Sequence, residues 1–341
     1  GVTIATTVHD PDLPEAEALL GPDGRRAVEV AVEATGGRVV DVELTQVMYE
    51  PGRSLAVRWT VAVDWPGVGV RDESLVAAVD DDGPPEGSFV LEADGLRVGM
   101  YRWPYDPSLP GLGLAADSAE RPEWWEHCGD GLALDVVTYR PGRRAVIRGT
   151  GEDGEVFVKV LKPHRAERLM RRHRALAGAG LPVPEVLHAD EANGVVVTRA
   201  VEGETLRAVL ERGGPVPDPA ELVALVERLP EALLRSARRA QAPSEDVARH
   251  SGTIAAVLPE AAPLLERIAT AIGESPEPTG LEPVHGDFYD DQVLVQDGVV
   301  TGLLDIDGAG SGRRVDDFGT LLGHLVNREA DVDLPSYSAY V

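Results

Sequence analysis

The sequence predicts an α+β protein, because strand-like and helix-like patterns occupy separate stretches of the chain. Apolar and polar residues alternate across 39–103 and again across 133–161, which is the period of a half-buried strand. Helical spacing dominates from residue 205 onward. The 341 residues suggest about two domains, and the 43% hydrophobic content is enough for a substantial core.

The first third of the chain begins with helical sequence and continues with strands. Segment 11–35 is expected to be helical, because an early Pro follows the cap-like Asp12 and apolar residues recur at Val28 and Val32. The period then changes to two, which predicts strands at 42–47, 55–61, 74–79, 88–91 and 96–103. The Pro- and Gly-rich stretch 107–123 predicts a boundary between subdomains.

The remaining elements alternate briefly and then become mainly helical. The expected strands are 133–139, 145–149, 156–161 and 195–201, and the expected helices are 165–179, 205–212, 219–240, 252–272 and 316–327. Strands 292–296 and 299–304 flank Asp297-Gly298, a strong signal for a β-hairpin.

A five-residue pattern occurs twice between predicted strands. Tyr49-Glu-Pro-Gly-Arg53 recurs as Tyr139-Arg-Pro-Gly-Arg143, and in both copies another Arg follows the Tyr by nine residues. Pro-Gly favours a type II turn, so a shared hairpin turn explains the pattern as well as duplication of a small β unit does. If Trp103-Pro104 corresponds to Lys162-Pro163, Met100 takes the place of Lys159.

The charge balance limits the partners of this protein. The 58 acidic residues outnumber the 32 basic ones and give a net charge of -26, which argues against nucleic acid or an anionic membrane. No apolar run approaches the roughly 20 residues of a membrane span, so we expect a cytoplasmic protein. Cys128 is the only cysteine, which excludes a disulfide or a cysteine-based zinc site within one chain. Arginines number 30, whereas Lys159 and Lys162 are the only lysines.

Polar clusters that end apolar runs near residues 285–307 match the needs of phosphoryl transfer. Such a site needs a carboxylate that accepts a proton, oxygen ligands for magnesium and a cation on the phosphates. Asp287 can be the base, while Gln292 and Asp305 offer oxygen ligands. Strand alternation places Asp307 on the same side as Asp305. Lys159 lies inside a β-branched run and therefore needs an anionic partner.

These residues resemble the motifs of the aminoglycoside phosphotransferase and choline kinase superfamily. The family pattern is His-Gly-Asp-x4-Asn, then Ile-Asp, then Asp-Leu-Ala, and this chain has His285-Gly-Asp287, Gln292, Asp305 and Asp317-Phe-Gly319. Gln at 292 and an acid at 307 are most similar to the maltokinase-related branch and its bacterial glucosamine kinases.

The resemblance implies an aminoglycoside phosphotransferase-like fold, which is bilobal and protein-kinase-like, with an extra N-terminal α+β cap subdomain. The cap is expected at 1–130, the kinase N-lobe at 131–201 and a mainly helical C-lobe with the catalytic loop at 202–341.

The resemblance also implies a role for each matching residue. Asp287 is the expected catalytic base, Gln292 and Asp305 are expected to bind Mg²⁺, and Lys159 is expected to contact the α- and β-phosphates of ATP. The strand at 195 leads to a hinge in which Arg199 to Val201 receive adenine through backbone groups.

Other residues near this loop have more open interpretations. Asp307 is either an exposed hairpin acid or a metal or substrate contact. Tyr289 and Asp290 lie beside the base on the expected acceptor side, where Asp290 or Asp291 either binds an ammonium group or is a solvated loop acid. His285 and Asp317 are expected to support the loop. Arg143 and Arg144 either approach the phosphates or remain solvated, as Lys162 is expected to do. Glu167 is the nearest candidate partner for Lys159.

The predicted function is ATP- and Mg²⁺-dependent transfer of the γ-phosphate to a hydroxyl of a small amino sugar, converting glucosamine to glucosamine 6-phosphate. The alternatives are a maltokinase, an aminoglycoside phosphotransferase, or a pseudokinase that binds nucleotide without catalysis. We expect a monomer whose partners are ATP and a small sugar, with no nucleic acid and no membrane.

Overall fold

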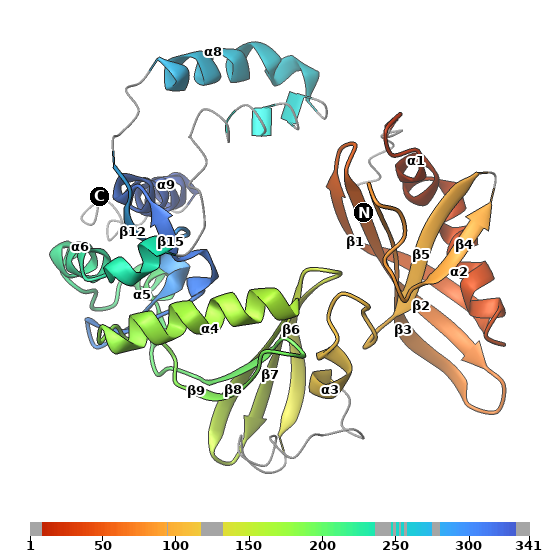
Figure 1. Ribbon diagram of the computed structural model, residues 1–341, viewed down its shortest axis with the longest axis horizontal. Coiled ribbons are helices and arrows are strands. Elements are labelled where there is room, and N and C mark those ends of the chain that lie inside the picture. The colour runs from red at the N-terminus through yellow and green to blue at the C-terminus, as the bar shows by residue number, and fades with distance from the viewer. Residues whose placement is uncertain are drawn as a thin grey trace. The chain divides into compact units, whose positions relative to one another are not determined.

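Two five-stranded sheets form most of the first unit of the chain (Figure 1). The computed structural model describes residues 9–93, 95–116, 132–235, 247, 250–251, 254–255, 258–274 and 280–331. Unit 1 comprises Gly1–Ala166 with His188–Val197, and unit 2 comprises Glu167–Leu187 with Thr198–Val341. The boundary expected between residues 130 and 131 lies outside the described residues.

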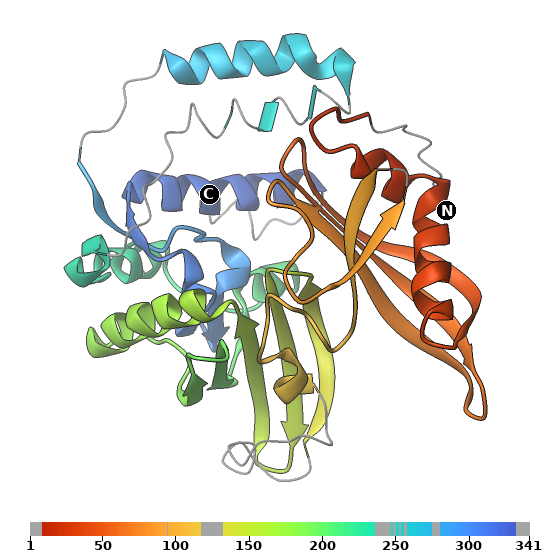
Figure 2. The same ribbon diagram turned by 45° about the vertical axis from the view of Figure 1, so that its right-hand side comes forward.

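The first sheet has the strand order β1-β2-β3-β5-β4, and all its pairs are antiparallel. Its strands are β1 (Arg38–Glu50), β2 (Ser54–Trp65), β3 (Gly69–Asp80), β4 (Phe89–Ala93) and β5 (Leu96–Arg102). Figure 2 shows α1 (Glu15–Leu20) and α2 (Pro22–Glu33) beside this sheet. Buried Val28 and Val32 of α2 join Val57 and Val61 of β2 in one apolar core, so the helices cover one face.

The helical segment expected over 11–35 consists of two helices. Gly21 lies between α1 and α2 with an extended backbone (φ -93°, ψ -165°). Pro22, which lacks a backbone N–H, then begins α2, where no hydrogen-bond donor is needed. The apolar spacing continues across this break, which is why the sequence pattern did not reveal it.

The second sheet repeats the order of the first, β6-β7-β8-β10-β9. Its strands are β6 (Ala133–Arg140), β7 (Arg144–Gly151), β8 (Gly154–Leu161), β9 (Val186–Asp190) and β10 (Val195–Arg199). Helix α4 (Pro163–Gly178) follows β8, whereas a turn follows β3. The short helix α3 (Leu112–Ala116) contacts β7 and β8.

The second unit carries the helices that follow the sheets and two small β pairings. The helical segments after α4 are α5 (Leu206–Glu211), α6 (Pro219–Glu227), 3₁₀ turns at Glu231–Arg235 and Pro259–Ala261, α8 (Ala262–Gly273) and α9 (Arg314–Asp331). The strands are β11 (Glu204–Thr205), β12 (Glu282–Val284), β13 (Val293–Gln296), β14 (Val299–Leu303) and β15 (Gly310–Gly312). Helix α6 ends before Pro230, whereas the sequence pattern favoured one helix through residue 240.

Among the described residues, every helix is too short or too polar to cross a bilayer.

Candidate active site

The loop that carries Asp287 is fixed to the end of helix α9. The carboxylate of Asp317 accepts the backbone N–H of His285 at 2.7 Å and that of Gly286 at 2.8 Å. The His285 imidazole meets the carbonyl oxygen of Leu304 at 2.8 Å through Nε2. Asp317 is only 2% exposed, and burial raises the pKa of its carboxyl, against the lowering effect of the two N–H groups. The supporting roles expected for His285 and Asp317 are confirmed.

Asp287 is exposed although its neighbours are buried. His285 and Phe288 are both 0% exposed, and their rings meet edge to face with centroids 5.8 Å apart. Asp287 lies between these two anchors and is exposed. A carboxylate presented to solvent from a rigid loop suits proton acceptance from an incoming hydroxyl group.

The expected metal ligands Gln292 and Asp305 lie at the same end of the β13–β14 hairpin. Val293 pairs with Leu303, and the backbone N–H of Leu304 donates to the carbonyl oxygen of Gln292 at 2.8 Å. Gln292 is 7% exposed, and Asp305, the residue after Leu304, is half-buried. The hairpin therefore brings together a neutral and an anionic oxygen donor.

Strand alternation is the wrong argument for Asp307. Strand β14 ends at Leu303, Asp305 adopts a left-handed backbone (φ 48°, ψ 48°), and a 3₁₀ turn covers Ile306–Gly308. Asp307 is half-buried, and its carbonyl oxygen accepts a hydrogen bond from Arg172 at 2.5 Å. Its side chain therefore does not repeat the direction of Asp305 through a two-residue period.

Tyr289 lies in the field of several acids of this loop. Burial raises the pKa of its phenol, and the negative charges of Asp287, Asp291 and Asp305 add to the rise. A hydrogen bond from the Gln292 side chain acts in the opposite direction. The expected base Asp287 and the expected metal ligands Gln292 and Asp305 therefore all act on the same phenol.

Asp290 does not face solvent as a substrate-binding acid would. It is 0% exposed within a 3₁₀ turn, Asp290–Gln292. The Nδ1 atom of His324 lies 4.0 Å from its carboxylate, and the His324 ring stacks on Tyr289. Asp291 is held instead by Arg207 at 2.6 Å.

Sequence reasoning assigned no role to His324. Its position on α9 carried a usable signal, because it follows Asp317 by seven residues and Leu321 by three. This spacing places all three on one face of a helix. Leu321 is 6% exposed, so this is the buried face.

The two lysines lie in the first unit. Lys159 is half-buried on β8, opposite Val146 of β7. Lys162 is half-buried and lines a cavity of about 400 Å³. Glu167, the expected partner of Lys159, forms an exposed pair with Arg171 at 3.1 Å.

Of the expected adenine contacts, Arg199 ends β10 and Val201 follows it by two residues. The backbone N–H of Arg199 donates to the carbonyl oxygen of Glu185 at 2.9 Å, and its guanidinium pairs with the same residue. That N–H is therefore engaged within the protein. Val201 is half-buried.

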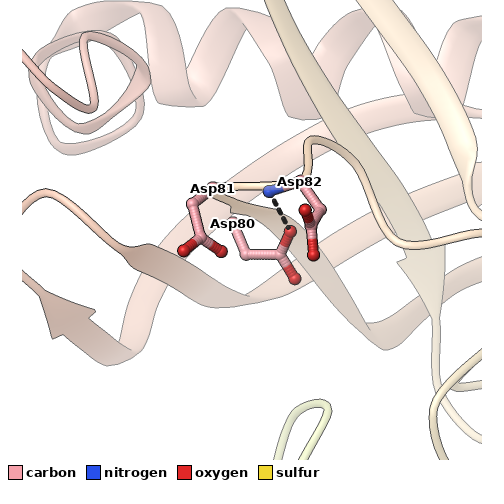
Figure 3. A group of neighbouring side chains, drawn as sticks. All are labelled: Asp80, Asp81 and Asp82. Atoms are coloured by element: carbon pink, nitrogen blue, oxygen red, sulfur yellow. Dashed lines mark hydrogen bonds between the residues drawn. The ribbon is translucent and has the colours of Figure 1, made fainter.

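In the part of the chain that the structure describes, one group of three acids is close enough to share a cation. Figure 3 shows Asp80, Asp81 and Asp82 at the turn after β3, where the Asp82 backbone N–H donates to Asp80 at 3.0 Å. All three are exposed, and they belong to a different unit from Asp287.

The residues at the hairpin end fit a magnesium ion. Mg²⁺ prefers oxygen donors and takes one or two carboxylates together with phosphate oxygens. Gln292 and Asp305 supply such donors, and the acids around Tyr289 create a negative field that a divalent cation relieves.

Comparison with known proteins extends this picture. A model of the phosphotransferase enzyme family matches residues 142–339, more than half of the chain. Together with the sheets and helices described above, this match confirms the expected aminoglycoside phosphotransferase-like fold. No curated protein sequence matches the chain.

Three solved structures illustrate the similarity. A type VIII aminoglycoside-3'-phosphotransferase is 26% identical, covers 62% of this chain and 84% of its own, and has a TM-score of 0.43. A macrolide 2'-phosphotransferase from Brachybacterium faecium is 19% identical, with coverages of 62% and 78% and a TM-score of 0.41. An aminoglycoside phosphotransferase from Streptomyces rimosus, in complex with ADP and streptomycin, is 20% identical, with coverages of 64% and 86% and a TM-score of 0.43.

Proposed function

Because the chain belongs to the phosphotransferase enzyme family, we propose that it transfers the γ-phosphoryl group of ATP to a hydroxyl group of a small amino sugar. Enzymes of this family transfer phosphate to hydroxyl groups of antibiotics or sugars. Glucosamine is the proposed acceptor and glucosamine 6-phosphate the product. The observation that carries this proposal is the exposed Asp287, held in a buried, doubly anchored loop that shares its surroundings with Gln292 and Asp305.

Each residue of the proposed site has its own task. The acceptor hydroxyl loses its proton to the Asp287 carboxylate as its oxygen attacks the γ-phosphorus, and ADP leaves with the electrons of the broken P–O bond. Gln292 and Asp305 hold Mg²⁺, which neutralises charge on the transferring phosphoryl group. Lys159 contacts the α- and β-phosphates, and Arg199 and Val201 receive the adenine.

The charges near the base favour a cationic acceptor. Asp287, Asp291 and Asp305 all act on the Tyr289 phenol as negative charges, and Arg207 pairs with Asp291. An amino sugar carries an ammonium group that this field attracts, whereas maltose carries none. Tyr289 is half-buried beside Asp287 and offers a ring for the acceptor.

An aminoglycoside is the second candidate acceptor, because the same negative field favours its ammonium groups. A pseudokinase is the candidate outside enzyme chemistry, and it predicts nucleotide binding without transfer. The base, the two metal-binding oxygens and the lysine occur together in this chain, which supports an enzyme.

A phosphorylation panel tests the proposal. Magnesium-dependent ADP release is measured with glucosamine, glucose, maltose and kanamycin. We expect the highest kcat/KM with glucosamine, and we expect Asp287→Asn to remove at least 99% of it, since general-base catalysis contributes about 10²–10⁴-fold. Asp297→Asn is the matched control, because Asp297 is an exposed turn residue of the β13–β14 hairpin that follows the Asp287 loop. Preference for kanamycin or maltose refutes the amino sugar, and full turnover by Asp287→Asn refutes the base.

A further inference from the structure

The two sheets of the first unit share more than their strand order. Arg53 N–H donates to the carbonyl oxygen of Glu50 at 2.9 Å, and Arg143 N–H donates to Arg140 at the same distance. Residues 50–53 are called here the first turn and residues 140–143 the second turn. Gly52 and Gly142 both adopt φ 67°, so the backbones of the two turns match.

Each turn is held by an aspartate from a distant segment. Asp106 accepts the Tyr139 hydroxyl at 2.9 Å and the backbone N–H of Gly142 at 2.8 Å. Asp10 accepts the Tyr49 hydroxyl at 2.5 Å and the backbone N–H of Gly52 at 2.7 Å.

The two aspartates open the same short motif, Asp-Pro-x-Leu-Pro, at residues 10–14 and 106–110. In both motifs the backbone N–H two residues after the aspartate donates to the aspartate carboxylate, at 3.1 Å from Asp12 and at 2.9 Å from Ser108. The same motif, turn and network therefore occur twice, followed by sheets of the same order. This agreement supports duplication over a chance similarity of turns.

The two copies of the β unit differ at the position of Lys159. Ala56 and Val146 each follow the tyrosine of their pattern by seven residues, and their cross-strand partners are Ala78 and Lys159. Ala78 is therefore the counterpart of Lys159, and the alternative pairing with Met100 is wrong because Met100 lies on β5. The first copy lacks the cation that the second offers to a nucleotide.

This comparison assigns Asp106 a task, because only its network belongs to the copy that carries Lys159. We propose that Asp106 is a positioning residue that fixes the second turn for contact with the nucleotide phosphates, while Asp10 holds a turn with no nucleotide. The inference rests on the proposed function for the identity of the ligand. With Gly142 N–H directed at Asp106, the second turn presents side chains rather than that amide to a phosphate. Arg140 and Arg143 are the cations it carries, and Arg144 follows at the start of β7.

The neighbourhood of Asp106 suits a fixed turn. Asp106 is 2% exposed, and the Tyr139 ring meets Trp103 edge to face at 4.8 Å and lies 5.6 Å from the Arg58 guanidinium carbon. Arg143 also pairs with Glu50 of the first turn, beside the cavity of about 400 Å³. Tyr139 thus packs against an aromatic ring and a guanidinium group, and its hydroxyl donates to Asp106.

Tyr139→Phe and Tyr49→Phe form a matched pair of variants, since each removes one hydroxyl from one network. We expect Tyr139→Phe to raise KM for ATP and Kd for ADP about five- to tenfold, the effect of one lost hydrogen bond, with kcat and KM for glucosamine within about twofold. Hydrogen exchange at Gly142 N–H should accelerate at least tenfold. Tyr49→Phe should leave all nucleotide constants within about twofold, and Asp106→Asn should agree with Tyr139→Phe.

Two results overturn the proposal. One is an equal effect of Tyr139→Phe and Tyr49→Phe on the nucleotide constants, which means that the networks only stabilise the fold. The other is a wild-type protein that does not bind ADP in calorimetry. If the wild type binds ADP but phosphorylates no acceptor, the proposed function fails, and the ADP dissociation constants of the two variants still decide this inference.

Discussion

The phenol ring of Tyr289 stacks on the imidazole of His324, with ring centroids 4.3 Å apart and an angle of 21° between the planes. Tyr289 follows the exposed Asp287 by two residues, and His324 comes from helix α9, far along the chain. The stack therefore fixes the surface beside the base by a long-range contact. Aromatic pairs of this kind are worth about 0.5–1.5 kcal/mol beyond the burial of their area.

His324→Ala is expected to weaken acceptor binding more than nucleotide binding. Without the imidazole the Tyr289 ring loses its support, so KM for the acceptor should rise about two- to tenfold, which corresponds to the free energy of the stack. KM for ATP should change by less than about twofold. Steady-state kinetics with each substrate varied in turn measures both constants. His9→Ala, an exposed histidine of the first unit, is the control, and equal changes in both KM values contradict the expectation.

Asp317→Ala is expected to reduce both stability and turnover. It removes the acceptor of the buried His285 N–H, at a cost of about 1–3 kcal/mol, and that of the part-buried Gly286 N–H, at a smaller cost. Misplacement of Asp287 by even 1 Å should lower kcat about 100-fold. Urea unfolding and turnover assays measure the two effects. Asn327→Ala, an exposed residue of the same helix, should change the free energy of unfolding by less than about 0.5 kcal/mol, and a similar loss in both variants would argue against the loop contact.

Asp10 and Asp106 occupy equivalent positions in the two networks, but they should make the free energy of unfolding depend on pH in opposite directions. The Tyr49 hydroxyl lowers the pKa of Asp10, whereas burial raises the pKa of Asp106 despite its hydrogen bonds. An acid with a lowered folded pKa stabilises the fold above its unfolded value of about 3.9 and loses that effect as the pH falls through the folded pKa. An acid with a raised folded pKa contributes most below about 3.9 and loses that contribution as the pH rises through the folded pKa.

The difference in unfolding free energy between wild type and Asp10→Asn should therefore grow as the pH rises through the range below about 4. The difference between wild type and Asp106→Asn should shrink as the pH rises above about 4. Denaturant unfolding between about pH 3 and about pH 7 measures both, and slopes of the same sign would contradict the assigned shifts.

Gly194→Ala is expected to disrupt the second sheet. Gly194 has φ +76°, and an added Cβ would lie 1.9 Å from the carbonyl oxygen of Leu161, whose N–H donates to Gly194 at 2.8 Å. Gly154, at φ +110° in the same sheet, has open space around its Cβ position. Gly154→Ala should cost only the backbone strain of about 1–3 kcal/mol, and Gly194→Ala should cost more. Chemical denaturation compares them, and equal losses would mean that the backbone moves away from the added atom.

Local patterns were enough to predict most strands of the two sheets. The alternation in 55–61 and 156–161 corresponds to β2 and β8, and Asp297-Gly298 forms the turn of the β13–β14 hairpin. The sequence pattern missed β9 of the second sheet and three strands of two or three residues. Residues 204–205, 282–284 and 310–312 pair only because distant segments meet, which no local period records.

In the site, too, sequence spacing predicted the local features and missed those that depend on packing between distant segments. The spacing from Asp287 to Gln292 is local, and the hairpin brings Gln292 and Asp305 to one end as expected. His324 and the 3₁₀ turn after Asp305 depend on packing, so sequence spacing missed the first and mispredicted the direction of Asp307. Asp106 directly precedes the stretch 107–123, which predicted only a boundary between subdomains and gave no signal for the contact with Tyr139.

The identical strand order of the two sheets gives each hairpin two possible neighbours while the chain folds. Repeated modules in one chain are prone to misassembly and strand exchange, and differences between the copies prevent it. Lys159 is such a difference. A chain in which β8 replaced β3 would put an ammonium group where Ala78 is only 7% exposed, at a high desolvation cost. Lys159, which is proposed to contact a nucleotide, therefore also disfavours the exchange of β8 for β3.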